Sequence, residues 1–264
     1  RMDDDRPRPF AAVLNELCSQ ASAPDGGRYS NVALARAIGE RGGKVTNSYI
    51  AQLRRGIRDN PTLRQVAQFA DVLGVHPAYF VGGRRDPAHP TGARRSFQDR
   101  LNFLFGNVPR PDRAGEYGHE AVATAVRARG RELRDPQWTI SPNTVAELRH
   151  GENPNPTWRH LLALADFFQV KPAYFLDDEL AAQVDEQITQ YKLLHRLGLT
   201  SVATRAAQTA EALSPDARAS LVRALVDALR PIGVTPRTAM RALATELDAD
   251  QNSADQNSID DKDS

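Results

Sequence analysis

An internal repeat constrains the fold of this chain more than any other feature of its sequence. Residues 48–83 align without a gap on residues 143–178, and 15 of the 36 aligned positions are identical. Self-similarity on this scale is typical of a supersecondary unit that is used more than once. The 264-residue chain is therefore predicted to contain two copies of one small domain. Two upstream segments repeat as well, residues 29–42 as 117–130 and residues 10–17 as 97–104.

Apolar residues recur at helical spacing in both copies. The clearest helix lies between Thr46 and Gly56, because threonine and glycine favour the two ends of a helix. Between them, Ile50 and Leu53 have the spacing of one buried helix face. No stretch alternates apolar and polar residues for long enough to predict a strand. We predict an all-α chain with five short helices in each copy.

Shifts in composition predict the boundaries between the parts of the chain. Residues 84–95 contain four arginines together with prolines and glycines, which is typical of a flexible basic linker. Behind the second copy, amphipathic helical patterns carry apolar stripes that need cover from one another or from a second subunit. The predicted parts are a flexible N-terminus (1–9), domain 1 (10–83), the linker (84–95), domain 2 (96–178), a C-terminal helical oligomerisation segment (179–248) and a disordered acidic tail (249–264).

The helix after Thr46 carries polar side chains on its outer face. Because Ile50 and Leu53 face the core, Ser48, Gln52 and Arg55 are predicted to share an outer stripe, with Asn47 at its start. Asparagine and glutamine can pair with adenine, and arginine with guanine, when such a helix lies in the major groove. An ordinary solvated helix face is the competing interpretation, and the pattern favours DNA contact over it.

Two further helix starts are predicted to anchor DNA phosphates. The first turn of a helix presents backbone N–H groups that bind anions, and such turns begin at Ser30-Asn31 and at Thr62. Arg58 adds positive charge close to the second of them. The predicted DNA-binding residues of domain 1 are Ser30, Asn31, Thr46, Asn47, Ser48, Gln52, Arg55, Arg58 and Thr62.

Domain 2 has the same helix with a different charge. Residues 46–65 contain four arginines and one aspartate, whereas residues 141–160 contain two arginines and two glutamates. Glu147 replaces Gln52 and is repelled by phosphates unless it accepts a hydrogen bond from cytosine. Domain 1 is therefore the stronger predicted reader of DNA. The candidate contacts in domain 2 are Ser141, Asn143, Thr144, Glu147 and His150.

These motifs resemble a known family. The polar N-cap, the I-x-x-L pair, the closing glycine and the following proline of residues 46–61 resemble phage-repressor-type (XRE/Cro) helix-turn-helix regulators. Residues 97–230 more closely resemble the EspR family of actinobacterial nucleoid-associated regulators. The resemblance implies two tandem five-helix repressor-like helix-turn-helix domains followed by a C-terminal helical dimerisation segment. It implies double-stranded DNA as the partner and a homodimer formed through residues 179–248.

Charge and composition limit the alternatives. Residues 1–178 carry 25 Lys and Arg against 20 Asp and Glu, so an acidic partner is expected to bind this part. No apolar run is long enough to cross a membrane, and the first residues do not resemble a secretion signal. The expected location is therefore the cytoplasm, at the nucleoid. With one cysteine and no metal-binding histidine spacing, we predict no metal site and no cofactor.

The predicted function is a DNA-binding transcriptional regulator or nucleoid-associated protein. No phosphate-binding glycine loop or catalytic motif occurs in the sequence, so we do not expect an enzyme. Two alternatives remain at this point. One is a protein-interaction module that keeps the repressor-like fold without binding DNA, and the other is a repressor controlled by a small-molecule effector.

Overall fold

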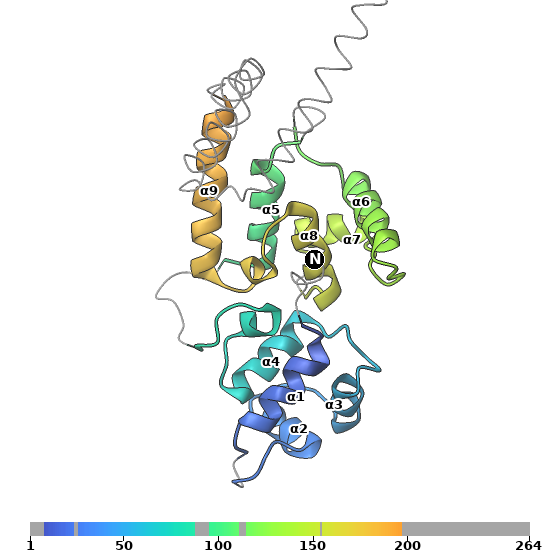
Figure 1. Cartoon of the computed structure of the whole chain (residues 1–264), viewed down its shortest axis with the longest axis vertical. Coiled ribbons are helices and arrows are strands. Elements are labelled where there is room, and N and C mark those ends of the chain that lie inside the picture. The colour runs from blue at the N-terminus through green and yellow to red at the C-terminus, as the bar shows by residue number, and fades with distance from the viewer. Residues whose placement is uncertain (1–7, 24–25, 88–94, 111–114, 154, 197–264) are drawn as a thin grey trace, which may run out of the picture. The chain divides into compact units, whose positions relative to one another are not determined.

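The computed structural model describes residues 8–23, 26–87, 95–110, 115–153 and 155–196 (Figure 1). Within these ranges all regular secondary structure is helical, apart from two isolated β-bridges. This confirms the all-α prediction. The first repeat contains α1 (Phe10–Gln20), α2 (Asn31–Glu40), α3 (Asn47–Arg54), α4 (Leu63–Leu73) and the 3-10 helix η1 (Pro77–Val81). The second contains α5 (Phe97–Asn107), α6 (His119–Glu132), α7 (Pro142–His150), α8 (Trp158–Phe168) and η2 (Pro172–Phe175), and α9 (Asp178–Arg196) follows it.

The chain divides into two compact units. The first consists of residues 1–104 and 117–181 and contains most of both repeats, and the second consists of residues 105–116 and 182–264. Within the second unit, the Lys192 ammonium donates to the carbonyl oxygen of Gly106 at 2.8 Å. The helices predicted after residue 199 and the acidic tail at 249–264 lie outside the described residues, as do most of the basic linker and of the N-terminus.

Polar caps begin the helices at the positions that the sequence indicates. The hydroxyl of Thr46 accepts a hydrogen bond from the Tyr49 amide, and Ser141 does the same for Thr144 at the start of α7. At the C-terminal end of α4, Gly74 adopts a left-handed backbone with a φ of 64°. Gln169 takes the same conformation at the equivalent position after α8, with a φ of 56°. The repeat is thus visible in the caps as well as in the helices.

Each repeat has the same aromatic pair in its core. The ring of Phe10 on α1 stacks on Phe80 of η1, with ring centres 5.0 Å apart. In the second repeat, Phe97 stacks on Phe175 of η2 at 4.7 Å. Both 3-10 helices therefore close the core of their own repeat, and the burial of Phe80 and Phe175 accounts for the aromatic residues shared at these positions.

An arginine at the C-terminal end of α3 connects three parts of the first repeat. The Arg54 guanidinium donates to Asn15 Oδ1 of α1 at 2.7 Å and to Asn31 Oδ1 of α2 at 2.8 Å. It also reaches the carbonyl oxygen of Tyr29 at 3.4 Å. The Asn15 amide returns a hydrogen bond to the Arg54 carbonyl. This network holds α3 against the two helices that precede it.

The second repeat uses the equivalent arginine in the same way. The Arg149 guanidinium donates to Asn102 Oδ1 at 3.0 Å and contacts His119 Nε2 at 3.3 Å. The Asn102 amide donates to the Arg149 carbonyl, as Asn15 does in the first repeat. The same arginine–asparagine contact therefore holds α3 in the first repeat and α7 in the second.

The longer connection after α6 in the second repeat requires a close backbone approach. Gly130 is buried near the end of α6. A Cβ atom at this position would lie 2.5 Å from the carbonyl oxygen of Trp138, a distance that side chains cannot adopt without movement. The loop therefore packs directly on the helix. Asp135 in the same loop accepts a hydrogen bond from Arg159 of α8 at 2.8 Å.

The buried imidazole of His160 should make the second repeat sensitive to acid. Its Nδ1 is buried without a hydrogen-bond partner, and burial lowers the pKa of His160 below its usual value of 6.5. The unfolded chain therefore binds more protons than the folded chain around and below that value, so stability falls as the pH falls through this range. Gln65 at the equivalent position in the first repeat completes a capping box by accepting from the Thr62 amide.

We expect His160→Gln to remove most of this acid sensitivity and to preserve the fold. Denaturant unfolding followed by circular dichroism between pH 8 and pH 5.5 measures the effect as the difference in free energy of unfolding. The wild-type protein should lose stability toward pH 5.5 and the variant should lose less. Parallel pH profiles for the two proteins would contradict the assignment to His160.

Candidate nucleic-acid interface

The outer face of α3 is exposed, as the sequence predicts. Ile50 and Leu53 are fully buried and anchor the helix to the core. Asn47, Ser48 and Arg55 are exposed, and Gln52 is half-buried. The buried pair therefore directs a polar stripe of amide, hydroxyl and guanidinium groups toward solvent, with the chemistry that base edges in a major groove can accept.

Arg55 and Arg58, which follow α3, are oriented by different contacts. The Nε of Arg55 donates to the carbonyl oxygen of Ala51 at 3.1 Å, which orients its guanidinium along the helix end. The guanidinium of Arg58 lies over the Tyr49 ring, 5.6 Å from its centre, in a cation–π contact. The Tyr49 hydroxyl in turn donates to Gln65 Oε1 at 3.0 Å. Arg55 and Arg58 thus remain exposed while their orientation is restricted.

The N-terminus of α2 is available on the same repeat. The Ser30 hydroxyl caps the helix by accepting from the Ala33 amide at 3.1 Å. Asn31 contributes its side-chain oxygen to the Arg54 network, so this residue supports α3 from within the repeat. The backbone N–H of Asn31 lies in the first turn of α2, where binding of a phosphate oxygen is favoured.

The N-terminus of α4 differs from the sequence-based expectation. Its first two amides bind the other repeat: Leu63 N–H donates to the Pro156 carbonyl at 2.9 Å, and Arg64 N–H donates to Asn155 Oδ1 at 3.0 Å. The third amide, that of Gln65, donates a hydrogen bond to the Thr62 hydroxyl. With these donors engaged, the turn at Thr62 has no free amide for a phosphate, so the expected phosphate contact at Thr62 is not supported.

The second repeat presents α7 with comparable geometry. Val145 and Leu148 are buried, while Asn143 and His150 are exposed. The Ser141 and Thr144 hydroxyls lie 2.8 Å apart, so the cap uses both. Glu147 and Thr144 are half-buried on the outer side of the helix. The side chains predicted for this repeat therefore lie together at the surface of α7.

Charge distinguishes the two repeats more than shape does. Asp59, the only acidic residue within 46–65, is engaged by Arg159 at 2.5 Å. In the second repeat, Arg129 forms ion pairs with Glu132 and Asp166, which reduces the positive charge that it offers to a partner. Lys44, Arg55 and Arg58, which lie in the sequence next to or within a few residues of α3, are exposed.

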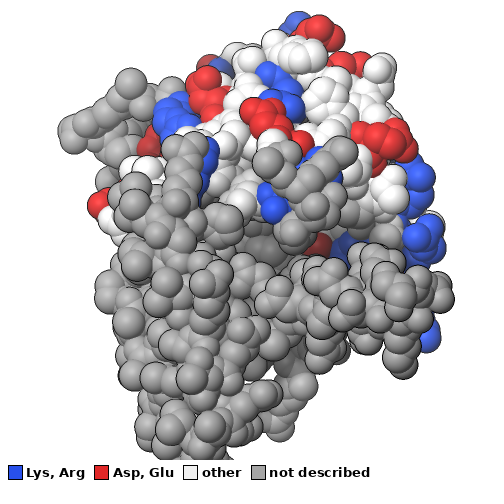
Figure 2. Space-filling view, turned by 90° about the horizontal axis from the view of Figure 1, so that it is seen from above, with Lys and Arg blue, Asp and Glu red and all other residues white. Residues whose placement is uncertain are grey.

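One face of the molecule carries both signs of charge. Figure 2 shows Lys and Arg interspersed with Asp and Glu over the described part of that face. Such mixed surfaces do not concentrate anions as a patch of one sign does. The described part of the face in Figure 2 is therefore a poor candidate for phosphate binding.

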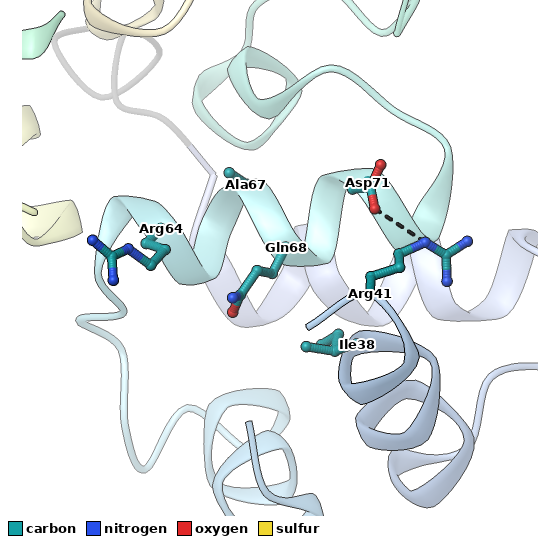
Figure 3. Close-up of a pocket in the computed structure, with 6 residues that line it drawn as sticks. All are labelled: Ile38, Arg41, Arg64, Ala67, Gln68 and Asp71. Atoms are coloured by element: carbon teal, nitrogen blue, oxygen red, sulfur yellow. Dashed lines mark ion pairs between the residues drawn. The ribbon is translucent and has the colours of Figure 1, made fainter. Parts of the chain in front are cut away.

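An open hollow of about 230 Å³ lies between α2 and α4 (Figure 3). Arg41 and Arg64 lie toward its two ends, and Arg41 is paired with Asp71 at 3.0 Å. The second repeat has the equivalent ion pair between Arg129 and Asp166 at 3.3 Å, so this pair belongs to the repeated fold. The hollow therefore gives no particular support to an effector site.

Among the residues that the structure describes, no group of three or more His, Cys, Asp or Glu side chains could hold a metal ion. None of the helices described is long and apolar enough to span a membrane.

Comparison with known proteins identifies the family. A helix-turn-helix family model matches residues 28–80, which contain α2, α3 and α4. The chain is 34% identical over 111 residues to the nucleoid-associated protein EspR of two Mycobacterium tuberculosis strains, CDC 1551 / Oshkosh and ATCC 25618 / H37Rv. This alignment covers 42% of the chain and 78% of EspR in each case. With most of EspR matched and an XRE-type domain present, the chain belongs to the EspR-like family of XRE-type helix-turn-helix DNA-binding regulators.

Proposed function

We propose that this regulator reads the major groove of double-stranded DNA with α3, and that α7 is a second and weaker reader. The observation that carries the proposal is the polar stripe of exposed Asn47, Ser48 and Arg55 and half-buried Gln52 above two fully buried anchors. A helix held in this way can enter the groove without rearranging the core of its repeat. The Ser30 and Asn31 turn and Arg58 would contact the flanking phosphates, and Thr46 would hold the start of α3.

In the second repeat, Ser141, Asn143 and Thr144 would take the equivalent positions near the DNA. In the second repeat, Glu147 and His150 stand at the positions of Gln52 and Arg55 in the first repeat. The second repeat therefore offers less positive charge to the groove. One chain would thus contact two half-sites with unequal strength. A dimer would contact up to four and could bridge separate DNA segments at the nucleoid.

Dimerisation would use residues 179–248. The described part of α9 supports this proposal through its apolar stripe. Leu180, Val184 and Ile188 recur at helical spacing and are only half-buried in the single chain. A second subunit against this stripe would remove more apolar area from water.

Alanine substitutions on α3 test the reading of DNA. We expect Asn47→Ala, Gln52→Ala and Arg55→Ala each to weaken the binding of genomic duplex fragments by about 1–3 kcal/mol, since each removes a base contact. Fluorescence anisotropy at fixed salt measures the dissociation constants. Arg36→Ala is the matched control, because it removes an exposed cation that is paired with Glu40 on α2.

Salt dependence separates DNA binding from protein docking. DNA binding by the wild-type chain should weaken steeply between about 50 and 200 mM salt, because counterions are released from the phosphates. A module that docks on a protein through an apolar face should respond little. If the three α3 variants bind DNA within twofold of the wild type, direct reading by α3 is wrong.

A further inference from the structure

The turns that start α4 and α8 pair with each other. Both contain the sequence Asn-Pro-Thr, at residues 60–62 and 155–157. The Leu63 amide donates to the Pro156 carbonyl at 2.9 Å, and the Trp158 amide donates to the Pro61 carbonyl at 2.8 Å. Thr62 and Thr157 thereby form an antiparallel β-bridge. All of these residues belong to one compact unit of the chain.

The pairing is reciprocal in its side chains too. Asn155 Oδ1 accepts from the Arg64 amide at 3.0 Å, and Asn60 Oδ1 accepts from the Arg159 amide at 2.9 Å. Each of these backbone and asparagine hydrogen bonds made by one repeat is returned by the equivalent residue of the other. Contacts of this kind are those of a two-fold symmetric dimer. Here both halves lie in one chain.

Packing around the paired turns extends the contact. Trp158 is almost fully buried, and its ring meets Phe10 of the first repeat edge to face, with ring centres 5.3 Å apart. A Cβ atom on Gly83 would lie 3.0 Å from the Cβ of Ala173, so the backbone approaches η2 closely at this point. Apolar burial of this type is the main source of stability in protein contacts.

Two arginines add charged contacts between the repeats. The Arg159 guanidinium reaches Asp59 of the first repeat at 2.5 Å and Asp135 of its own repeat at 2.8 Å. Arg84 reaches Asp177 at the end of the second repeat at 3.1 Å. Asp177 is 5% exposed, so this pair is shielded from solvent. The contact therefore combines backbone pairing, aromatic burial and two ion pairs, of which the one with Asp177 is shielded.

The paired turns lie close to both DNA-reading helices in the sequence. α3 ends at Arg54 and α7 ends at His150, each a few residues before its paired turn. Eight residue steps separate Arg54 from Thr62, and seven separate His150 from Thr157. A chain spans about 3.5 Å per residue at most, so the ends of the two helices are no more than about 60 Å apart. This range includes the spacing of about 34 Å between half-sites one turn of DNA apart.

We infer that the paired turns, rather than the linker, hold α3 and α7 at one fixed separation, so that a single chain acts as an internal dimer on DNA. This inference rests on the proposed function for its DNA part, while the pairing itself does not. A free linker of residues 84–95 would span up to about 40 Å and allow many half-site spacings. A fixed pair selects one spacing.

A designed disulfide tests the pairing. Thr62 and Thr157 form the type of antiparallel pair that is not joined by its own hydrogen bonds, with Cα atoms about 4.5 Å apart, and a disulfide needs about 4.4–6.8 Å. The full-length Thr62→Cys/Thr157→Cys variant under mild oxidation should form one internal disulfide, seen by mass spectrometry and by faster migration on a non-reducing gel. Each single variant is the control, because Cys18 is 1% exposed. A folded double variant that forms no disulfide would overturn the pairing.

A longer linker tests the pairing without changing either helix cap. Twenty glycine and serine residues inserted within residues 88–94 should leave the half-site spacing unchanged when bound duplexes are selected from a random library. A broader spacing distribution than that of the wild type would show that the linker sets the separation, and would overturn the inference.

The disulfide-locked protein tests whether the pair is the form that binds DNA. Its dissociation constant for the selected duplex should lie within twofold of that of the reduced protein. If locking abolishes binding that the reduced protein retains, DNA requires the pair to open and the inference is wrong. If neither form binds DNA while the disulfide still forms, the proposed function fails and the pairing stands.

Discussion

Arg54→Ala is expected to lower the free energy of unfolding of the first repeat by about 3 kcal/mol. The substitution removes hydrogen bonds to Asn15, Asn31 and the Tyr29 carbonyl at once. Each acceptor left without a donor in a partly buried site costs about 1–3 kcal/mol, and solvent access to the exposed part of the network reduces the sum. α3 would then lose its connection to α1 and α2. Denaturant unfolding followed by circular dichroism measures the loss.

Arg55→Ala is the matched control for this prediction. It removes the neighbouring arginine, which is exposed and bonds only to the carbonyl of Ala51 among the contacts in the described structure. Exposed substitutions of this kind change stability by less than about 0.5 kcal/mol. Arg149→Ala should destabilise the second repeat as Arg54→Ala does the first. Equal stabilities for Arg54→Ala and Arg55→Ala would show that the network does not hold α3.

The substitutions Gln52→Glu and Glu147→Gln should change the affinity for DNA in opposite directions. Gln52→Glu puts a carboxylate on the exposed stripe of α3 and removes an amide that can pair with adenine, so we expect affinity to fall about 10- to 100-fold. Glu147→Gln removes the carboxylate from α7 and should raise affinity several-fold. Anisotropy titrations at one fixed salt concentration measure both.

The control for the charge exchange is Glu40→Gln on α2. This carboxylate is paired with Arg36 and belongs to α2, not to the stripe on α3. It should change affinity less than either exchange does, although the net charge changes by the same amount as in Glu147→Gln. Weaker binding by Glu147→Gln would mean that Glu147 accepts from a cytosine amino group, and would reverse the ranking of the two repeats.

The sequence was sufficient to predict the helices and the outer face of α3. Thr46 is predicted as a helix cap and accepts the hydrogen bond that a cap requires, and Ser141 at the aligned position does the same. Ile50 and Leu53 were expected to face the core, and both are fully buried. These features depend on residues three or four positions apart, which a repeating pattern in the sequence reveals directly.

Two roles were not visible in the sequence. Arg54 was counted among the positive charges of the DNA-binding region, yet its guanidinium is used to hold α1, α2 and α3 together. The turn at Thr62 was expected to bind phosphate, yet its amides bind the second repeat. For the contact at Thr62, the sequence holds one signal: both copies contain Asn-Pro-Thr. A contact between two copies of the same turn uses the same residues twice.

The amino-acid sequence by itself determined that the chain repeats one helical unit and presents a polar stripe on each copy. Only the tertiary structure decided that Arg54 holds the helices together and that the amides at the start of α4 bind the second repeat. The physical reason is distance along the chain. Caps and helix faces arise among near neighbours in the sequence. Asn15 contacts Arg54 only after the first repeat has folded, and Asn60 contacts Arg159 only after the two repeats have packed together.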